Sequence, residues 1–159
     1  MAKMLICYYS RTQHTQHMAE AIEQGAAEVE GVEVTVLPVA KVSARDLLEY
    51  DAIVMGSPTY YGSMAAELKQ LIDESVALHG QLKGKVGGAF SSSANIAGGN
   101  ETTIMDILKA MLIHGMIVQG MPTGDHYGPV AIDDVDHRAR TQCTNLGQTV
   151  AELAVRLHG

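Results

Sequence analysis

Short apolar runs recur along the chain and predict strands that are buried on both faces. Three continuous runs cover Met4–Tyr9, Ala52–Gly56 and Val86–Phe90, and a shorter one covers Met116–Val118. One segment differs, because residues 32–36 alternate valine with glutamate or threonine. That alternation has the period of a strand with one polar side. The pattern therefore predicts five strands.

Between these strands, apolar residues recur at helical spacing. We expect four longer helices, over residues 15–28, 64–76, 100–112 and 139–157. Ser43 and Asp46 have the spacing of a capping box, which predicts a short helix through Glu49. Strands that alternate with helices indicate a parallel sheet covered on both faces. Residues 1–159 are therefore predicted to form a single α/β domain.

The order of the strands follows from which one lies at the edge. Residues 32–36 form the one strand with clean alternation, which places the second strand at an edge of the sheet. Right-handed crossovers leave few topologies, and the order 2-1-3-4-5 of a flavodoxin-like three-layer sandwich meets this condition. In such sheets ligands bind outside the carboxyl ends of the strands, around the switch point between the first and third strands. Functional residues are therefore expected in the loops after the first, third and fourth strands.

The loop after the first strand carries three hydroxyl groups just before a helix. It consists of Ser10, Arg11, Thr12, Gln13, His14 and Thr15. Free backbone N–H groups and the helix dipole favour an anion at this end, and hydroxyls add further donors. The residues alone fit a phosphate-binding loop and an ordinary Ser/Thr cap equally well. A P-loop is excluded, because Gly84-Lys85, the only Gly-Lys pair, is followed by Val86.

The loops after the third and fourth strands are aromatic and small-polar, respectively. The first consists of Pro58, Thr59, Tyr60, Tyr61 and Gly62, and the second contains Ser91, Ser92, Ser93, Ala94, Asn95, Gly98 and Gly99. Without a ligand role, the first loop would be a turn with incidental aromatic residues and the second a flexible loop. We favour a site for a planar ring, because two of the six tyrosines of the chain stand at the ligand edge and offer flat faces. The glycine-rich loop adds backbone donors and acceptors for the edge of a heterocycle.

Charge and composition exclude several other classes of protein. The chain has 18 acidic and 11 basic residues, and its net charge of −7 disfavours nucleic acid and anionic membranes as partners. No apolar run approaches the roughly 18 residues of a membrane span. The seven histidines are scattered, so no metal site is expected. Cys7 and Cys143 lie in apolar patterns, which predicts buried thiols and a cytoplasmic location.

Two long segments carry a resemblance to a known family. The runs GSPTYYGSMAAELKQLID and LKGKVGGAFSSSANIAGGNETTIMDILKAMLIHGM resemble the WrbA-type FMN-dependent NAD(P)H:quinone oxidoreductases of the flavodoxin superfamily. The resemblance implies FMN as the cofactor, NAD(P)H as the electron donor and a quinone as the acceptor. It also implies that residues 10–15 hold the FMN phosphate, and that residues 58–62 and 91–95 line the isoalloxazine ring together with Gly98 and Gly99.

His114 is the candidate catalytic residue, because it matches a family histidine near the flavin ring. It also fits a helix C-cap, since Gly115 follows it, and the two roles are compatible. A helix that ends before the fifth strand lies near the opposite edge of the sheet from the ligand site. We therefore expect His114 to approach a flavin only across a subunit interface, in a homo-oligomer such as a dimer or tetramer. Nine methionines also suit an adaptable interface.

The chain departs from the family in length, and this favours an alternative function. It lacks the family's extension between the second and third strands, and Met121–Ala131 is shorter than the corresponding segment. The alternative is a flavodoxin-like carrier of one or two electrons between partner redox proteins, although flavodoxins usually flank the flavin with a tryptophan and this chain has none. A receiver domain shares the strand order but is excluded, because Asp51 lies at the start of the third strand rather than at its end.

Overall fold

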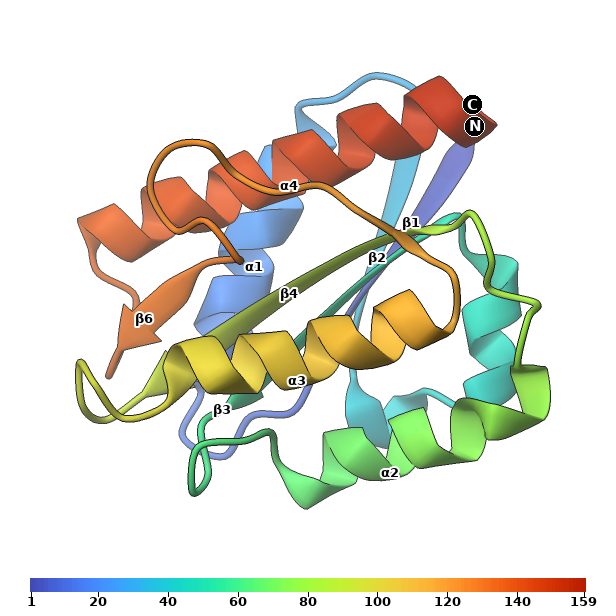
Figure 1. Ribbon diagram of the computed structural model, residues 1–159. Coiled ribbons are helices and arrows are strands. Elements are labelled where there is room, and N and C mark those ends of the chain that lie inside the picture. Colours follow the sequence, from blue (N-terminus) through green and yellow to red (C-terminus); the bar gives the residue numbers. More distant parts are fainter.

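The computed structural model describes all 159 residues, and strands alternate with helices along the chain (Figure 1). The strands are β1 (Ala2–Tyr8), β2 (Val32–Pro38), β3 (Ala52–Pro58), β4 (Val86–Ser93), β5 (Ile117–Val118) and β6 (Val130–Ile132). The α-helices are α1 (His14–Ala27), α2 (Ala66–Glu74), α3 (Asn100–Ile113) and α4 (His137–His158). Three short 3-10 helices are η1 (Val39–Lys41), η2 (Ala44–Glu49) and η3 (Ser75–Leu78). None of the helices combines the length and the apolar character needed to cross a bilayer.

The strands pair in parallel in the order β2-β1-β3-β4-β5, which confirms the predicted order. β1 lies between β2 and β3, with Ile6 opposite Val36 on one side and Val54 on the other. β2 is at the edge and its residues are mostly half-buried, whereas β3 and β4 are buried almost throughout. Because all these strands run in one direction, the loops that follow β1, β3 and β4 share one edge of the sheet.

The sheet has one strand more than the five that the sequence pattern predicts. β5 pairs with the start of β4 through Ile117 and Val118, whereas β6 pairs with the end of β4 through residues 130–132. The two short strands therefore occupy the two ends of one position beside β4, and the chain leaves the sheet between them. Pro122 and Pro129 lie in or at the end of this detour and have no N–H to donate to a ladder. A three-residue strand is too short for a hydrophobic pattern to reveal.

The helices differ from the prediction mainly at one place. The helix expected over residues 64–76 ends at Glu74, and η3 follows it, so that Val76 is exposed rather than packed. The predicted capping box is confirmed, because the Ser43 N–H donates to the Asp46 carboxylate at 2.8 Å and η2 follows.

Two layers of helices cover the sheet, α1 and α4 on one face and α2 and α3 on the other (Figure 1). Each layer encloses its own apolar core, and alternate residues of β1 serve the two: Ile6 faces the α1–α4 core, whereas Leu5 faces the α2–α3 core. The contact between α1 and α4 depends on Gly25 and Gly147. A Cβ on either glycine would overlap a backbone carbonyl of the opposite helix.

Candidate functional site

A cleft of about 450 Å³ opens at the carboxyl edge of the sheet, near the switch point between β1 and β3. Its walls come from the loops after β1, β3 and β4 and from the residue after β6. The lining residues are Arg11, Thr12, His14, Pro58, Thr59, Tyr60, Ser92, Ser93, Ala94 and Asp133. All of them except Asp133 belong to the candidate residues. The structure thus brings the three predicted loops together around one hollow.

The remaining candidates of these loops do not line the cleft but lie within the loops or flank it. They are Ser10, Gln13, Thr15, Tyr61, Gly62, Ser91, Asn95, Gly98 and Gly99. Their neighbours, described below, show that several of them shape the backbone or join one loop to another.

The loop after β1 has backbone donors that no backbone acceptor in the protein satisfies. The N–H groups of residues 11–15 have no backbone acceptor in the protein, and α1 begins at His14 behind them. No acidic residue lies in the first turn of α1. The hydroxyls of the loop differ: Thr12 is exposed at the cleft, whereas Thr15 is buried and lies 2.9 Å from the Ser92 hydroxyl. Free N–H groups at a helix N-terminus favour an anion such as a phosphate.

The loop after β3 folds back in a tight turn at Tyr60–Ser63. Tyr60 and Ser63 exchange two backbone hydrogen bonds, of 2.8 and 3.1 Å. Tyr61 and Gly62 between them have φ angles of 49° and 77°, as in the two-residue turns that require left-handed backbone at both central positions. Tyr60 lines the cleft and Tyr61 is fully exposed at the tip. One of the two tyrosines is thus available as a flat wall.

The loop after β4 is held by its serines. The Ser91 hydroxyl lies 2.9 Å from that of Thr59, and Ser93 accepts a hydrogen bond of 2.9 Å from the Asn100 amide. Residues 94–98 are exposed beyond them. Gly99 has a φ of 102°, and a Cβ there would lie 2.7 Å from the Gly62 Cα. A glycine is therefore required for this loop to approach the tyrosine turn.

Backbone strain is concentrated around the cleft. Only Gln13, Tyr61 and Asp133 combine a positive φ with a side chain, and each belongs to a different loop of this edge. A single non-glycine residue in the left-handed region costs about 1–2 kcal/mol. Strained backbone of this kind clusters at functional sites, where the surrounding structure holds it in place.

Sequence reasoning missed the fourth wall of the cleft, which follows β6. The Asp133 N–H donates to the Ser93 carbonyl at 2.9 Å, and this places the Asp133 side chain at the cleft. Asp134 lies 2.9 Å from His17 on α1, and the hydrogen bond from His17 holds the pKa of Asp134 below its ordinary value. No motif in the sequence marks this wall, because the three residues of β6 that precede it are too few to show a strand pattern.

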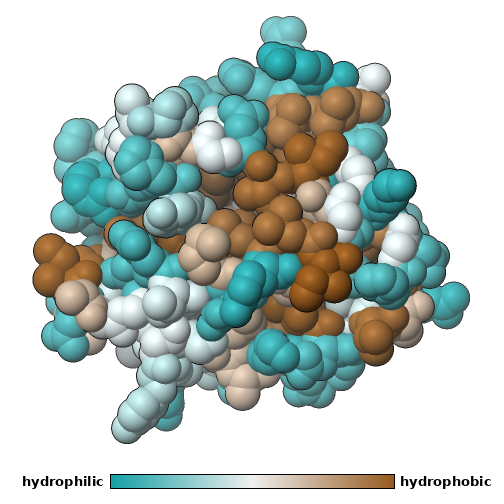
Figure 2. All heavy atoms as spheres, viewed as in Figure 1, coloured by the Kyte–Doolittle hydropathy of each residue, from teal (hydrophilic) through white to brown (hydrophobic).

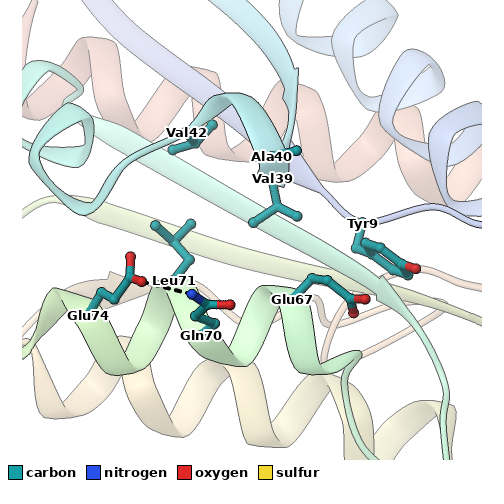
Figure 3. Close-up of a pocket in the computed structure, with 8 residues that line it drawn as sticks. All are labelled: Tyr9, Val39, Ala40, Val42, Glu67, Gln70, Leu71 and Glu74. Atoms are coloured by element: carbon teal, nitrogen blue, oxygen red, sulfur yellow. Dashed lines mark hydrogen bonds between the residues drawn. The ribbon is translucent and has the colours of Figure 1, made fainter.

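A second groove, of about 280 Å³, adjoins the tyrosines between η1 and α2 (Figure 3). The Tyr9 and Tyr60 rings meet edge to face with their centroids 6.4 Å apart, so this groove borders the cleft. Partial burial and the nearby Glu67 carboxylate raise the pKa of Tyr9, so its phenol is neutral at physiological pH. Figure 3 shows polar side chains of α2, among them Glu67 and Glu74, on the wall opposite η1.

His114 lies away from the cleft, as the sequence predicts for a single chain. It follows α3, whose 14 residues begin beside the cleft and extend for about 20 Å at 1.5 Å per residue. The His114 Nε2 lies 2.7 Å from the Ser75 hydroxyl, and its Nδ1 is buried without a partner. Burial, with a smaller contribution from His79, lowers the pKa of His114. The imidazole is therefore neutral at pH 7, and it caps α3 against η3.

The fold and the cleft place the protein in the class of flavodoxin-like α/β proteins, and comparisons with known proteins refine this class. The family model described as NADPH-dependent FMN reductase matches residues 4–124. The chain is 36% identical over 199 residues to a NAD(P)H dehydrogenase (quinone) of Rhodopseudomonas palustris (strain TIE-1), with both chains fully covered. It is 41% identical over 157 residues to another of that name from Sinorhizobium fredii, covering 85% of this chain and 78% of the relative. The chain therefore belongs to the NADPH-dependent FMN reductase family.

Solved structures share the fold over nearly the whole chain. A flavodoxin from the domain Archaea matches with a TM-score of 0.80 and 29% identity, over 96% of this chain and 98% of that one. A WrbA-like flavodoxin from Agrobacterium tumefaciens matches with a TM-score of 0.83 and 24% identity, over 99% of both chains. The Rhodopseudomonas alignment spans 199 positions against 159 residues here, so some of its positions have no residue in this chain.

Proposed function

We propose that the protein is an FMN-dependent oxidoreductase that takes electrons from NAD(P)H and delivers them to a quinone or a similar acceptor. The observation that carries the proposal is the cleft, in which a helix N-terminus with free N–H groups and a tyrosine wall meet at the switch point of the sheet. Membership of the NADPH-dependent FMN reductase family and the quinone-dehydrogenase names of the relatives support the same activity. When bound, FMN supplies the redox chemistry, and the protein binds and orients it.

The residues present fit FMN. The free N–H groups of residues 11–15 and the Thr12 hydroxyl would hold the phosphate, with Arg11 and His14 beside it at the cleft. The Tyr60 ring would flank the isoalloxazine ring. The exposed residues 94–98 would meet the polar edge of the isoalloxazine with their backbone groups. The loop after β3 and the loop after β4 approach each other closely at Gly62 and Gly99, which closes this side of the cleft.

A homo-oligomer is part of the proposal, because it would bring His114 to a flavin. Apolar side chains gather on the α3 side of the molecule in Figure 2, and the exposed apolar residues of α3 and β5 are Met105, Leu112, Ile113 and Ile117. Leu112 and Ile113 directly precede His114 in the chain. His114 would then meet the flavin of another subunit as a neutral imidazole, and to hydrogen-bond it the ring would have to turn away from Ser75. Sedimentation of the FMN-loaded protein tests the assembly, and a monomer at high concentration would contradict it.

Two observations favour the alternative of an electron carrier. The chain shares 29% identity and its fold with an archaeal flavodoxin, and its charge of −7 suits docking to basic redox proteins. With either function, the two free buried cysteines fit a reducing cytoplasm, which we include in the proposal.

Calorimetry on the FMN-free protein tests the cofactor assignment. We expect FMN to bind at least a hundredfold more tightly than riboflavin, because several hydrogen bonds of about 1 kcal/mol each would be made to the phosphate. Equal affinity for the two flavins would show that the loop after β1 does not bind the phosphate.

A further inference from the structure

The turn that carries Tyr60 is fastened to α3 by two side chains that do not line the cleft. The Thr102 hydroxyl donates to the Gly62 carbonyl at 2.6 Å, and the Ser63 hydroxyl donates to the Asp106 carboxylate at 2.7 Å. Thr102 and Asp106 are four residues apart on α3 and so lie one above the other on the same face of the helix. The Gly62 carbonyl in the middle of the turn and Ser63 at its end are thus both held by residues outside the cleft.

These contacts have the features of a fixed anchor. The Thr102 oxygen lies at 2.6 Å from the Gly62 carbonyl and at 2.8 Å from the Gly99 carbonyl, and a hydroxyl has one proton, so the shorter contact is the favoured bond. Lys109 lies 2.8 Å from the other oxygen of Asp106. Hydrogen bonds from Lys109 and Ser63 lower the pKa of Asp106, which is therefore ionised at neutral pH and a strong acceptor.

The turn needs such an anchor, because its own conformation is unfavourable. Tyr61 is a non-glycine residue at a φ of 49°, and its side chain is fully exposed, so packing of that side chain does not fix the turn. Apart from the contacts with Thr102 and Asp106, the turn makes only its two internal backbone hydrogen bonds. A released turn would move the Tyr60 ring away from the cleft wall, and any ligand beside that wall would then have to order it again on binding.

We propose that Thr102 and Asp106 are positioning residues, which hold the Tyr60–Ser63 turn so that Tyr60 is already in place to flank the flavin. This inference rests on the proposed function, in that it takes FMN to be the ligand of the cleft. Neither residue lines the cleft, and in this proposal both act through the turn alone.

The test compares Thr102→Val and Asp106→Ala with two matched controls. Thr141→Val removes a hydroxyl that reaches only a carbonyl of its own helix, and Asp73→Ala removes a carboxylate paired only with Lys69 on α2. Thr102→Ser and Asp106→Asn are the conservative variants, since each keeps a group able to bond the turn. FMN affinity is measured by titration of the FMN-free protein, and amide hydrogen exchange at Tyr60 and Ser63 reports the turn itself.

We expect about tenfold weaker FMN binding and faster exchange at both amides in Thr102→Val and in Asp106→Ala. Both properties should stay at wild-type values in the controls and recover largely in the conservative variants. At saturating FMN, the quenching of flavin fluorescence should also decrease, since Tyr60 no longer lies against the ring. In a Tyr60→Ala background, neither change should weaken binding further.

Three results would overturn the inference. Wild-type affinity and exchange in both variants would show that the turn is not held by them. A tenfold loss that persists in the Tyr60→Ala background would show that they act by another route. A wild-type protein that binds no FMN would instead overturn the proposed function, and this inference with it, so the two failures are distinguishable.

Discussion

The hydroxyl of Thr15, in the first turn of α1, lies 2.9 Å from the hydroxyl of Ser92 near the end of β4, and both residues are buried. This contact joins the loop after β1 to the loop after β4, which are 77 residues apart in the sequence. The hydroxyls of Thr12 and Thr15, which look alike in the sequence, therefore have different roles. Thr15 connects two walls of the cleft, whereas Thr12 is free to meet a ligand.

Thr12→Val should therefore weaken FMN binding, whereas Thr15→Val should weaken the folded protein. Thr12→Val removes one donor to the FMN phosphate at nearly constant volume, which costs about 1.5–3 kcal/mol of binding, or roughly ten- to a hundredfold in affinity. Thr15→Val leaves the buried Ser92 hydroxyl without its partner and should lower the free energy of unfolding by about 1–3 kcal/mol. FMN titration and urea unfolding measure the two effects. Unchanged FMN affinity in Thr12→Val would place the phosphate elsewhere.

Stability should depend on the protonation of His114. Burial, and then His79, lower its pKa in the folded state below the ordinary 6.5, so the unfolded state binds more protons as the pH falls through that value. The free energy of unfolding should therefore be fully maintained above about pH 6.5 and decrease below it. His114→Gln keeps a polar group near Ser75 but does not titrate, so its profile should be flatter. Parallel profiles for the two proteins in urea unfolding between about pH 5 and 8 would contradict this role.

Both thiols should be inert in the folded protein. Burial raises the pKa of Cys7 and that of Cys143 to about 12, so almost no thiolate is present at neutral pH. Mass spectrometry after treatment with a thiol-alkylating reagent should find neither cysteine modified until a denaturant is added. Rapid labelling of the native protein at either position would contradict the buried placement.

Gly147→Ala should destabilise the contact between α1 and α4. The new Cβ would overlap the Ile22 carbonyl, and such overpacking costs about 1–3 kcal/mol, partly offset by up to about 1 kcal/mol of better helix propensity. Gly120→Ala is the control, because a Cβ there meets nothing within 4 Å. Thermal unfolding should show a lower midpoint for Gly147→Ala alone, and equal midpoints for the two variants would show that the helices can separate without cost.

The sequence predicted the architecture well, because parallel strands buried on both faces produce apolar runs that are hard to confuse. Met4–Tyr9 and Val86–Phe90 are such runs, and they correspond to β1 and β4, which flank the central strand β3. The three loops at the carboxyl edge followed from topology alone. β6 was missed because its three residues owe their conformation to pairing with β4 rather than to a pattern of their own.

The site was harder to predict, because side chains of one type take different roles once the chain is folded. Sequence reasoning could not separate Thr12 from Thr15, or the cleft-lining Tyr60 from the exposed Tyr61. It also could not find Asp133, Thr102 or Asp106, because their contacts cross from one loop or helix to another. Distances between elements that are remote in sequence decide these roles.

The most direct test of the central claim uses the FMN-loaded protein without oxygen and without any partner protein. NADPH or NADH is added first and a water-soluble benzoquinone second, while the visible absorption of the flavin is followed. The proposed function predicts that a pyridine nucleotide bleaches the flavin, that the quinone restores its colour, and that repeated additions give turnover. A flavin that stays oxidised with both nucleotides, and is bleached only when a separate reductase protein is supplied, would contradict the oxidoreductase and favour the electron carrier.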